Sequence, residues 1–109
     1  MINAILTGSA YDLAGDIPDQ SISLCLTDPV YWDIEQYEWL GRECARVLVP
    51  GGTVLAQVGN YYLIDAANAL VKNLEYIWTV AEVYPSVGSR LWERRIIQGW
   101  KPYLWFSKG

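Results

Sequence analysis

The spacing of apolar residues changes several times along this chain, and the order of these changes constrains the fold more than any other feature. Residues 21–27 alternate with a period of two, whereas the apolar residues of 34–48 recur every three or four positions. The same pair of patterns returns in residues 53–58 and 63–73. Alternation is typical of strands and the longer spacing of helices. Strands that alternate with helices predict an α/β fold with a largely parallel sheet.

The first clear strand is predicted at residues 21–27. Ile22, Leu24 and Leu26 alternate with residues that are at most weakly polar, so both faces of this strand tolerate burial. We expect it to be a central strand. A shorter strand is predicted at residues 3–6, followed by a helical turn at 9–14 and a turn-forming segment that contains Gly15 and Pro18.

The second half of the chain combines a helix stop with a hairpin. Asp33 is predicted to cap the helix that begins near Ile34, and residues 49–52, with the sequence VPGG, stop it before the next strand. Residues 76–84 and 103–107 are β-branched and aromatic, and the segment between them has no helical pattern. These two strands are predicted to pair as an antiparallel hairpin with a long loop.

Length and composition exclude several classes of protein. A chain of 109 residues fits one domain, residues 1–109, and its 52% hydrophobic content is enough for a packed core. No apolar run approaches the roughly 20 residues that cross a bilayer, so we expect a soluble, cytoplasmic protein with no membrane partner. Cys25 and Cys44 suit free thiols, and two cysteines without histidine predict no metal site.

The charge distribution argues against strong, autonomous binding to nucleic acid. The formal net charge is −4, whereas proteins that grip phosphates usually present a basic surface. The basic residues nevertheless gather near the C-terminus, where they are Arg90, Arg94, Arg95, Lys101 and Lys108. The arginines of this group are interpreted either as contacts to a phosphate backbone or as a solvated loop.

The segment TDPVYWD, residues 27–33, follows the predicted central strand and is the best candidate for a site. In open α/β sheets, ligands bind beyond the carboxyl ends of the strands. The Asp28 carboxylate and the Pro29 carbonyl accept hydrogen bonds, and Tyr31 offers a ring face, which together suit a planar group with an exocyclic amine. The alternative is purely structural: a strand cap and helix entry, with Tyr31 and Trp32 packed on the end of the sheet.

Three segments together resemble the amino-directed DNA methyltransferases, which modify adenine N6 or cytosine N4. The segment IPDQSISLCLTDPVYWD is similar to the family's Asp-Pro-Pro-aromatic motif with its flanks, ARVLVPGG to its next helix end and turn, and WKPYLWFSKG to a late strand. The resemblance implies a Rossmann-like methyltransferase sheet, mostly parallel with a C-terminal antiparallel hairpin. It also implies that part of the family sheet is lacking, because no G-x-G loop follows a strand.

The resemblance also implies site residues, a cofactor and partners. Catalytic roles fall on Asp28, Pro29 and Tyr31, with Asp28 also facing the cofactor S-adenosylmethionine. The residues implied for substrate binding are Val30, Trp32, Asn60, Arg90 and Arg94. For Asn60 the alternative is a cap on the helix at Leu63.

The implied reaction is methyl transfer to a flipped-out DNA base, with adenine N6 favoured by Asp at the first motif position. Val30 replaces the second proline of the family motif, which frees φ and restores a backbone N–H. DNA binding is expected to be weak or partner-assisted. A homodimer or a companion subunit is expected to cover the incomplete sheet, and the alternative function is a non-catalytic binding or assembly subunit.

Overall fold

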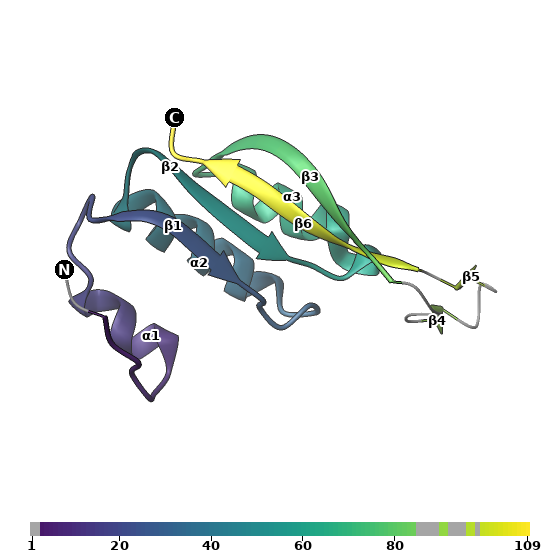
Figure 1. The fold of residues 1–109 in the computed structure, drawn as a ribbon, viewed down its shortest axis with the longest axis horizontal. Helices are drawn as coiled ribbons and strands as arrows, with labels where there is room; N and C mark the ends of the chain where they lie inside the picture. The colour runs from purple at the N-terminus through teal and green to yellow at the C-terminus, as the bar shows by residue number, and fades with distance from the viewer. Residues whose placement is uncertain (1–2, 85–89, 92–95, 98) are drawn as a thin grey trace.

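A four-stranded mixed sheet forms the centre of this computed structural model, which describes residues 3–84, 90–91, 96–97 and 99–109 (Figure 1). Its strands lie side by side in the order β1, β2, β6, β3. Strands β1 and β2 are parallel, and β6 is antiparallel to both β2 and β3. The bounds are Ile22–Thr27 for β1, Leu48–Gln57 for β2, Trp100–Ser107 for β6 and Glu75–Val83 for β3. The predicted α/β fold with a C-terminal antiparallel hairpin is confirmed.

Helices precede or follow each of the first three strands. Helix α2 connects β1 to β2, and helix α3 connects β2 to β3, as the spacing of apolar residues predicts. Two short strands, β4 and β5, pair with each other within the connection from β3 to β6. The bounds are Ala10–Leu13 for α1, Ala14–Asp16 for η1, Ile34–Val47 for α2, Asn60–Tyr62 for η2, Leu63–Val71 for α3, Arg90–Leu91 for β4 and Ile96–Ile97 for β5.

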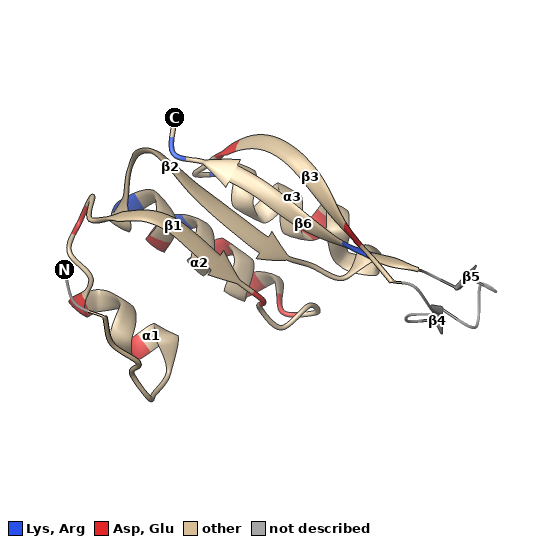
Figure 2. Ribbon diagram, viewed as in Figure 1, with Lys and Arg blue, Asp and Glu red and all other residues tan. Residues whose placement is uncertain are grey.

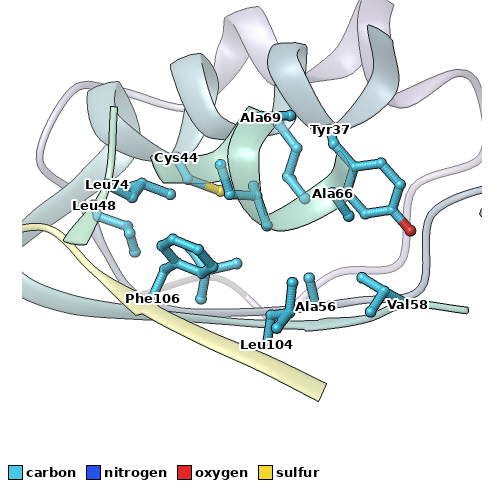
Figure 3. Close-up of a cluster of buried hydrophobic side chains, with 13 residues drawn as sticks. Tyr37, Cys44, Leu48, Ala56, Val58, Ala66, Ala69, Leu74, Leu104 and Phe106 are labelled. Atoms are coloured by element: carbon cyan, nitrogen blue, oxygen red, sulfur yellow. The ribbon is translucent and has the colours of Figure 1, made fainter. Parts of the chain in front are cut away.

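Helices α2 and α3 cover one face of the sheet, and the core lies between them and the strands (Figure 3). Side chains from the middle strands alternate, so that Val54 and Ala56 of β2, and Val58 directly after it, face the helices. Leu104 and Phe106 of β6 lie beside them, 1% and 0% exposed. Burial of this apolar surface is the main stabilising contribution to the fold.

The opposite face of the sheet is open in the described part of the chain. The pairing registers place Leu26, Leu55, Trp105 and Trp78 in one row across all four strands, since partners in register project to the same side. Leu26 and Trp78, at the two ends of the row, are 67% and 66% exposed. This apolar row is called the open face below.

Two predictions about the first strands are wrong. Strand β1 is an edge strand, not a central one, because among the described residues it pairs with β2 alone. Residues 3–6 form no strand, and Ile5 is 99% exposed. Residues 3–6 therefore do not pair with β1, and its outer side has no strand partner in the described part of the chain.

The turn at residues 49–52 lies within β2 rather than before it. Helix α2 ends at Val47, and the register of the parallel pair shifts between Leu48 and Thr53 to accommodate the extra residues. Gly51 adopts a φ of 81°, a conformation that glycine tolerates without strain. The Lys108 ammonium donates a hydrogen bond to the Leu48 carbonyl at 2.9 Å, so it helps to close this turn.

Arg46 fixes the segment that leads into β1. Its guanidinium donates to the carbonyls of Ala14 and Ile17 at 2.9 Å and 2.7 Å, and it also pairs with the carboxylates of Asp19 and Glu43. The hydrogen bonds to the Glu43 and Asp19 carboxylates raise the pKa of Arg46. The connection before β1 is therefore held to the last turn of α2.

Within the described ranges, no helix is long and apolar enough to cross a bilayer. In the same part of the chain, no three His, Cys, Asp or Glu residues are grouped so that they could hold a metal ion. Cys25 and Cys44 are free thiols, as the sequence indicates.

The two faces of the sheet are expected to respond differently to substitution. Leu104→Ala removes buried methyl groups and should lower the free energy of unfolding by about 2–5 kcal/mol. Leu26→Ser, on the open face, should change it by no more than about 0.5 kcal/mol. Urea unfolding of both variants measures this difference. A Leu26→Ser cost as large as that of Leu104→Ala would mean that the open face is covered in solution.

Candidate functional site

The candidate site lies where the parallel strands β1 and β2 end at the same edge of the sheet. Asp28 and Pro29 directly follow β1, and Gly59 lies two residues beyond the end of β2. Tyr31 packs on Gly59: a Cβ built on this glycine would stand 3.1 Å from the Tyr31 Cδ2 atom. Gly59 is therefore needed for the close approach of the ring, which places Tyr31 across the ends of both strands.

Lys101 of β6 holds the other side of Tyr31. Its Nζ donates a hydrogen bond to the Tyr31 hydroxyl at 3.2 Å and also lies 5.1 Å from the centre of the ring. The two contacts combine a charge-assisted hydrogen bond with a cation–π interaction, and both restrict the ring. Lys101 was not among the residues that the motif indicated.

The protonation states of this pair follow from their surroundings. Burial raises the pKa of Tyr31, the hydrogen bond from Lys101 opposes this rise, and the negative charge of Asp28 adds to it. The pKa of Lys101 is raised chiefly by its hydrogen bond to Tyr31. Tyr31 is thus a neutral phenol and Lys101 a cation at neutral pH.

The loop after Pro29 is held by backbone hydrogen bonds. The Val30 N–H donates to Oε1 of Gln36 at 3.2 Å, and the Val30 carbonyl accepts from the Asp33 N–H at 3.3 Å. A proline at position 30 could not make the first of these bonds, so the loop gains an anchor where it loses the rigidity of a proline ring. Asp33 is the N-cap residue of α2, as predicted, but its side chain makes no capping hydrogen bond.

Further polar side chains surround the cluster on the side of the open face. Gln57 of β2 donates to the Glu82 carboxylate of β3 at 3.0 Å. Tyr103 lies between these strands, and its pKa is raised by burial first and by its hydrogen bond with Glu82 second. Acceptors and donors therefore surround Asp28 and Tyr31 without a continuous basic strip among the described residues, as the dispersed charges of Figure 2 show.

A pocket of about 230 Å³ lies beside Pro29, between α1, the end of β1 and α2. Tyr11 and Trp39 form part of its wall and pack edge to face, with ring centres 4.6 Å apart. The remaining lining residues are Ser9, Ala10, Thr27, Gln36 and Leu40. Because Pro29 borders both the pocket and the Asp28 cluster, a ligand in the pocket would lie next to a group held by Asp28.

Tyr37 lies beneath the site and is buried to 0% exposure. Its hydroxyl has no hydrogen-bond partner among the described residues. The pKa of Tyr37 is raised, mainly by burial and further by the charges of Tyr31 and Asp28.

Four of the predicted site residues, Asp28, Pro29, Val30 and Tyr31, form one continuous stretch of the loop after β1. Trp32 is 71% exposed. The Asn60 side chain donates to the Trp100 carbonyl at 3.0 Å, and the N-cap of α3 is Tyr62, so Asn60 does not cap that helix. Arg90 lies in β4, and Arg94 lies outside the described residues.

Several residues of the site could not be selected from the motif alone. Lys101 and Tyr103 come from the last strand, and Gly59 and Tyr37 from the segments around β2 and α2. The sequence did contain a signal for Lys101, because Lys101, Tyr103 and Trp105 are spaced two residues apart and therefore lie on the same face of β6. No local pattern marks Gly59 or the Tyr37 hydroxyl.

Comparison with known proteins relates this geometry to one fold. No family profile matches the chain. It is 34% identical over 73 residues to the type II methyltransferase M.BglII of Bacillus subtilis, a match that covers 55% of this chain and 20% of that protein. The chain has the fold of the DNA methyltransferases. The resemblance inferred from the sequence is thereby confirmed.

Solved structures support the same assignment. The PvuII cytosine-N4-specific DNA methyltransferase matches 94% of this chain with 48% of its own, at a TM-score of 0.78 and 16% identity. The complex of M1.HpyAVI with SAM has a TM-score of 0.73 and 21% identity, and the match covers 93% of this chain and 52% of that one. TTHA0409 of Thermus thermophilus, also in complex with S-adenosyl-L-methionine, has a TM-score of 0.73 and 19% identity, and the match covers 93% of this chain and 51% of that one. The chain therefore spans about half the length of these structures and a fifth of M.BglII.

Lys101→Met should raise the pKa of Tyr31 further, because the substitution removes the hydrogen bond that opposes the effect of burial. An NMR titration with ¹³C-labelled tyrosine would follow the Tyr31 ring between pH 8 and 12. Lys72→Met is the matched control, since Lys72 pairs with Glu38 on the outside of the helices. An unchanged or lowered Tyr31 pKa in Lys101→Met would contradict the described contact.

Proposed function

We propose that this chain provides the target-base site of an S-adenosylmethionine-dependent DNA methyltransferase, acting on an exocyclic amine with adenine N6 favoured. The observation that carries the proposal is the grouping of Asp28, the Pro29 carbonyl and the Tyr31 ring at the ends of β1 and β2, on the fold of the DNA methyltransferases. The Asp28 carboxylate and the Pro29 carbonyl accept the two N–H bonds of the amine. The ring of Tyr31 stacks on the base.

The chemistry of this site is positioning and electrostatic preorganisation. When the two acceptors hold the N–H groups, the nitrogen lone pair is directed out of the plane of the base. Lys101 and Gly59 fix the Tyr31 ring so that the plane of the stacked base is defined. S-adenosylmethionine, when bound, supplies the methyl group. No histidine base is required for these roles.

The pocket beside Pro29 fits the cofactor in part. Its aromatic wall of Tyr11 and Trp39 and the hydroxyls of Ser9 and Thr27 suit a planar, polar heterocycle such as adenine. The volume of about 230 Å³ is smaller than most pockets that enclose a whole ligand of this size. These residues would hold one end of the cofactor, and a companion would enclose the rest.

A companion polypeptide or a second copy is part of the proposal. The free edge of β1, the apolar open face and the match to only half of each solved structure support completion of the sheet by another chain segment. The net charge of −4 supports DNA binding that depends on such a partner. The open face also favours the second candidate function, a non-catalytic assembly subunit.

Asp28→Ala should abolish methyl transfer, since the amine loses its charged acceptor, while the free energy of unfolding stays within about 0.5 kcal/mol for an exposed side chain. Incorporation of labelled methyl groups into adenine- and cytosine-containing duplexes would be measured for the chain alone and for mixtures with candidate companions. Asp19→Ala, at a surface ion pair, is the control. Undiminished transfer by Asp28→Ala would exclude the proposed site.

Titration with S-adenosylmethionine should change the fluorescence of Trp39, because this side chain lines the pocket. Trp39→Phe in the same titration identifies the source of the signal, with Trp32→Phe as the exposed control. A signal that survives Trp39→Phe but disappears in Trp32→Phe would move the cofactor site away from this pocket.

A further inference from the structure

The Tyr37 hydroxyl is a buried polar group that the fold itself does not use. Its side chain is 0% exposed, and no group of the described residues accepts or donates a hydrogen bond to it. A buried hydroxyl without a partner is destabilising, whereas a phenylalanine would fill the same space without that cost. The presence of a tyrosine rather than a phenylalanine at position 37 is therefore explained by where the hydroxyl lies, and not by packing of the core.

Tyr37 and Tyr31 both lie at the end of the sheet where Val58 and Gly59 follow β2 (Figure 3). Tyr37 belongs to the core cluster with Val58, and Tyr31 lies against Gly59. In Figure 3 the Tyr37 hydroxyl is at the same end of the cluster as Val58, away from Leu48 and Leu74 at the other end. The hydroxyl therefore lies directly under the candidate site, within reach of the charge of Asp28.

We propose that Tyr37 is a positioning residue whose hydroxyl donates a hydrogen bond to the Asp28 carboxylate when a base amine is held there. This inference rests on the proposed function. An ionised carboxylate accepts about four hydrogen bonds, so Asp28 can accept from Tyr37 and from the amine at once. Asp28 is exposed in the protein alone, and a donor from below would draw its carboxylate inward and orient it.

The other hydroxyl near Asp28 is less suited to this role. The Tyr31 hydroxyl already interacts with both Asp28 and Lys101, and its ring is needed for stacking. The raised pKa of Tyr37 keeps its phenol protonated, and therefore a donor, well beyond neutral pH. The hydroxyl also arrives from the core side, where it does not compete with the base for space.

The inference predicts that one variant keeps or gains thermal stability while it loses affinity for the base. Tyr37→Phe should leave the midpoint of thermal unfolding unchanged or higher, because it removes an unpaired buried hydroxyl. It should also weaken the recognition of the base about tenfold, the equivalent of one hydrogen bond to a charged group. A residue with only a structural role would not separate these two readouts.

The experiment measures the affinity of the chain, alone and in mixtures with candidate companions, for two short single-stranded DNAs, one with an adenine and one with an abasic site at the same position. The ratio of the two dissociation constants isolates the contribution of the base. Wild type, Tyr37→Phe, Asp28→Ala and the double variant are compared, and Tyr61→Phe, at a 69% exposed tyrosine, is the control for the exchange. Thermal unfolding is recorded for each protein.

The expected result is a lower ratio in Tyr37→Phe, a larger loss in Asp28→Ala, and no further loss when Tyr37→Phe is added to Asp28→Ala, because Tyr37 acts only through the Asp28 carboxylate. An unchanged ratio in Tyr37→Phe, or a lower unfolding midpoint, would overturn the inference while leaving the proposed function intact. A wild-type ratio of one, unchanged by Asp28→Ala, both in the chain alone and in mixtures with candidate companions, would overturn the proposed function, and the inference with it.

Discussion

The parallel pairing of β1 with β2 is the constraint on which the site depends. Parallel strands end at the same edge of a sheet, so the pairing brings Asp28 and Gly59 together although 30 residues separate them in the chain. Gly59 then admits the Tyr31 ring, and the antiparallel β6 adds Lys101 from the opposite direction. Without this pairing, residues 28–31 would form a local turn with no neighbouring strand end beside it.

The sheet that forms the site has one covered and one uncovered face. Helices α2 and α3 bury the first face, while the second presents an apolar row that includes two tryptophans. An exposed row of this kind usually marks an interaction surface. Its presence beside β1, which pairs with β2 alone in the described part of the chain, connects the question of function to that of assembly, since Asp28 directly follows this strand.

The loop between β1 and α2 shows how a departure from a family motif can be accommodated. Val30 frees one backbone torsion, but its N–H is bound by Gln36 in the first turn of α2. The loop is therefore anchored by a hydrogen bond where the motif would use a ring. The unpaired Tyr37 hydroxyl, one residue further along the same helix, is consistent with a site that sacrifices some stability for function.

The sequence by itself determined the alternation of strands and helices, the hairpin at the C-terminus, and the grouping of Asp28, Pro29 and Tyr31, because periodicity and a contiguous motif are local properties. It could not place β1 at the edge of the sheet, since an apolar strand looks the same whether or not a neighbour covers it. Only the tertiary structure decided that Lys101 and Gly59 contact Tyr31 and that the Tyr37 hydroxyl is buried without a partner among the described residues. These contacts join residues of different strands and helices, and pairing between distant segments leaves no local pattern in the chain.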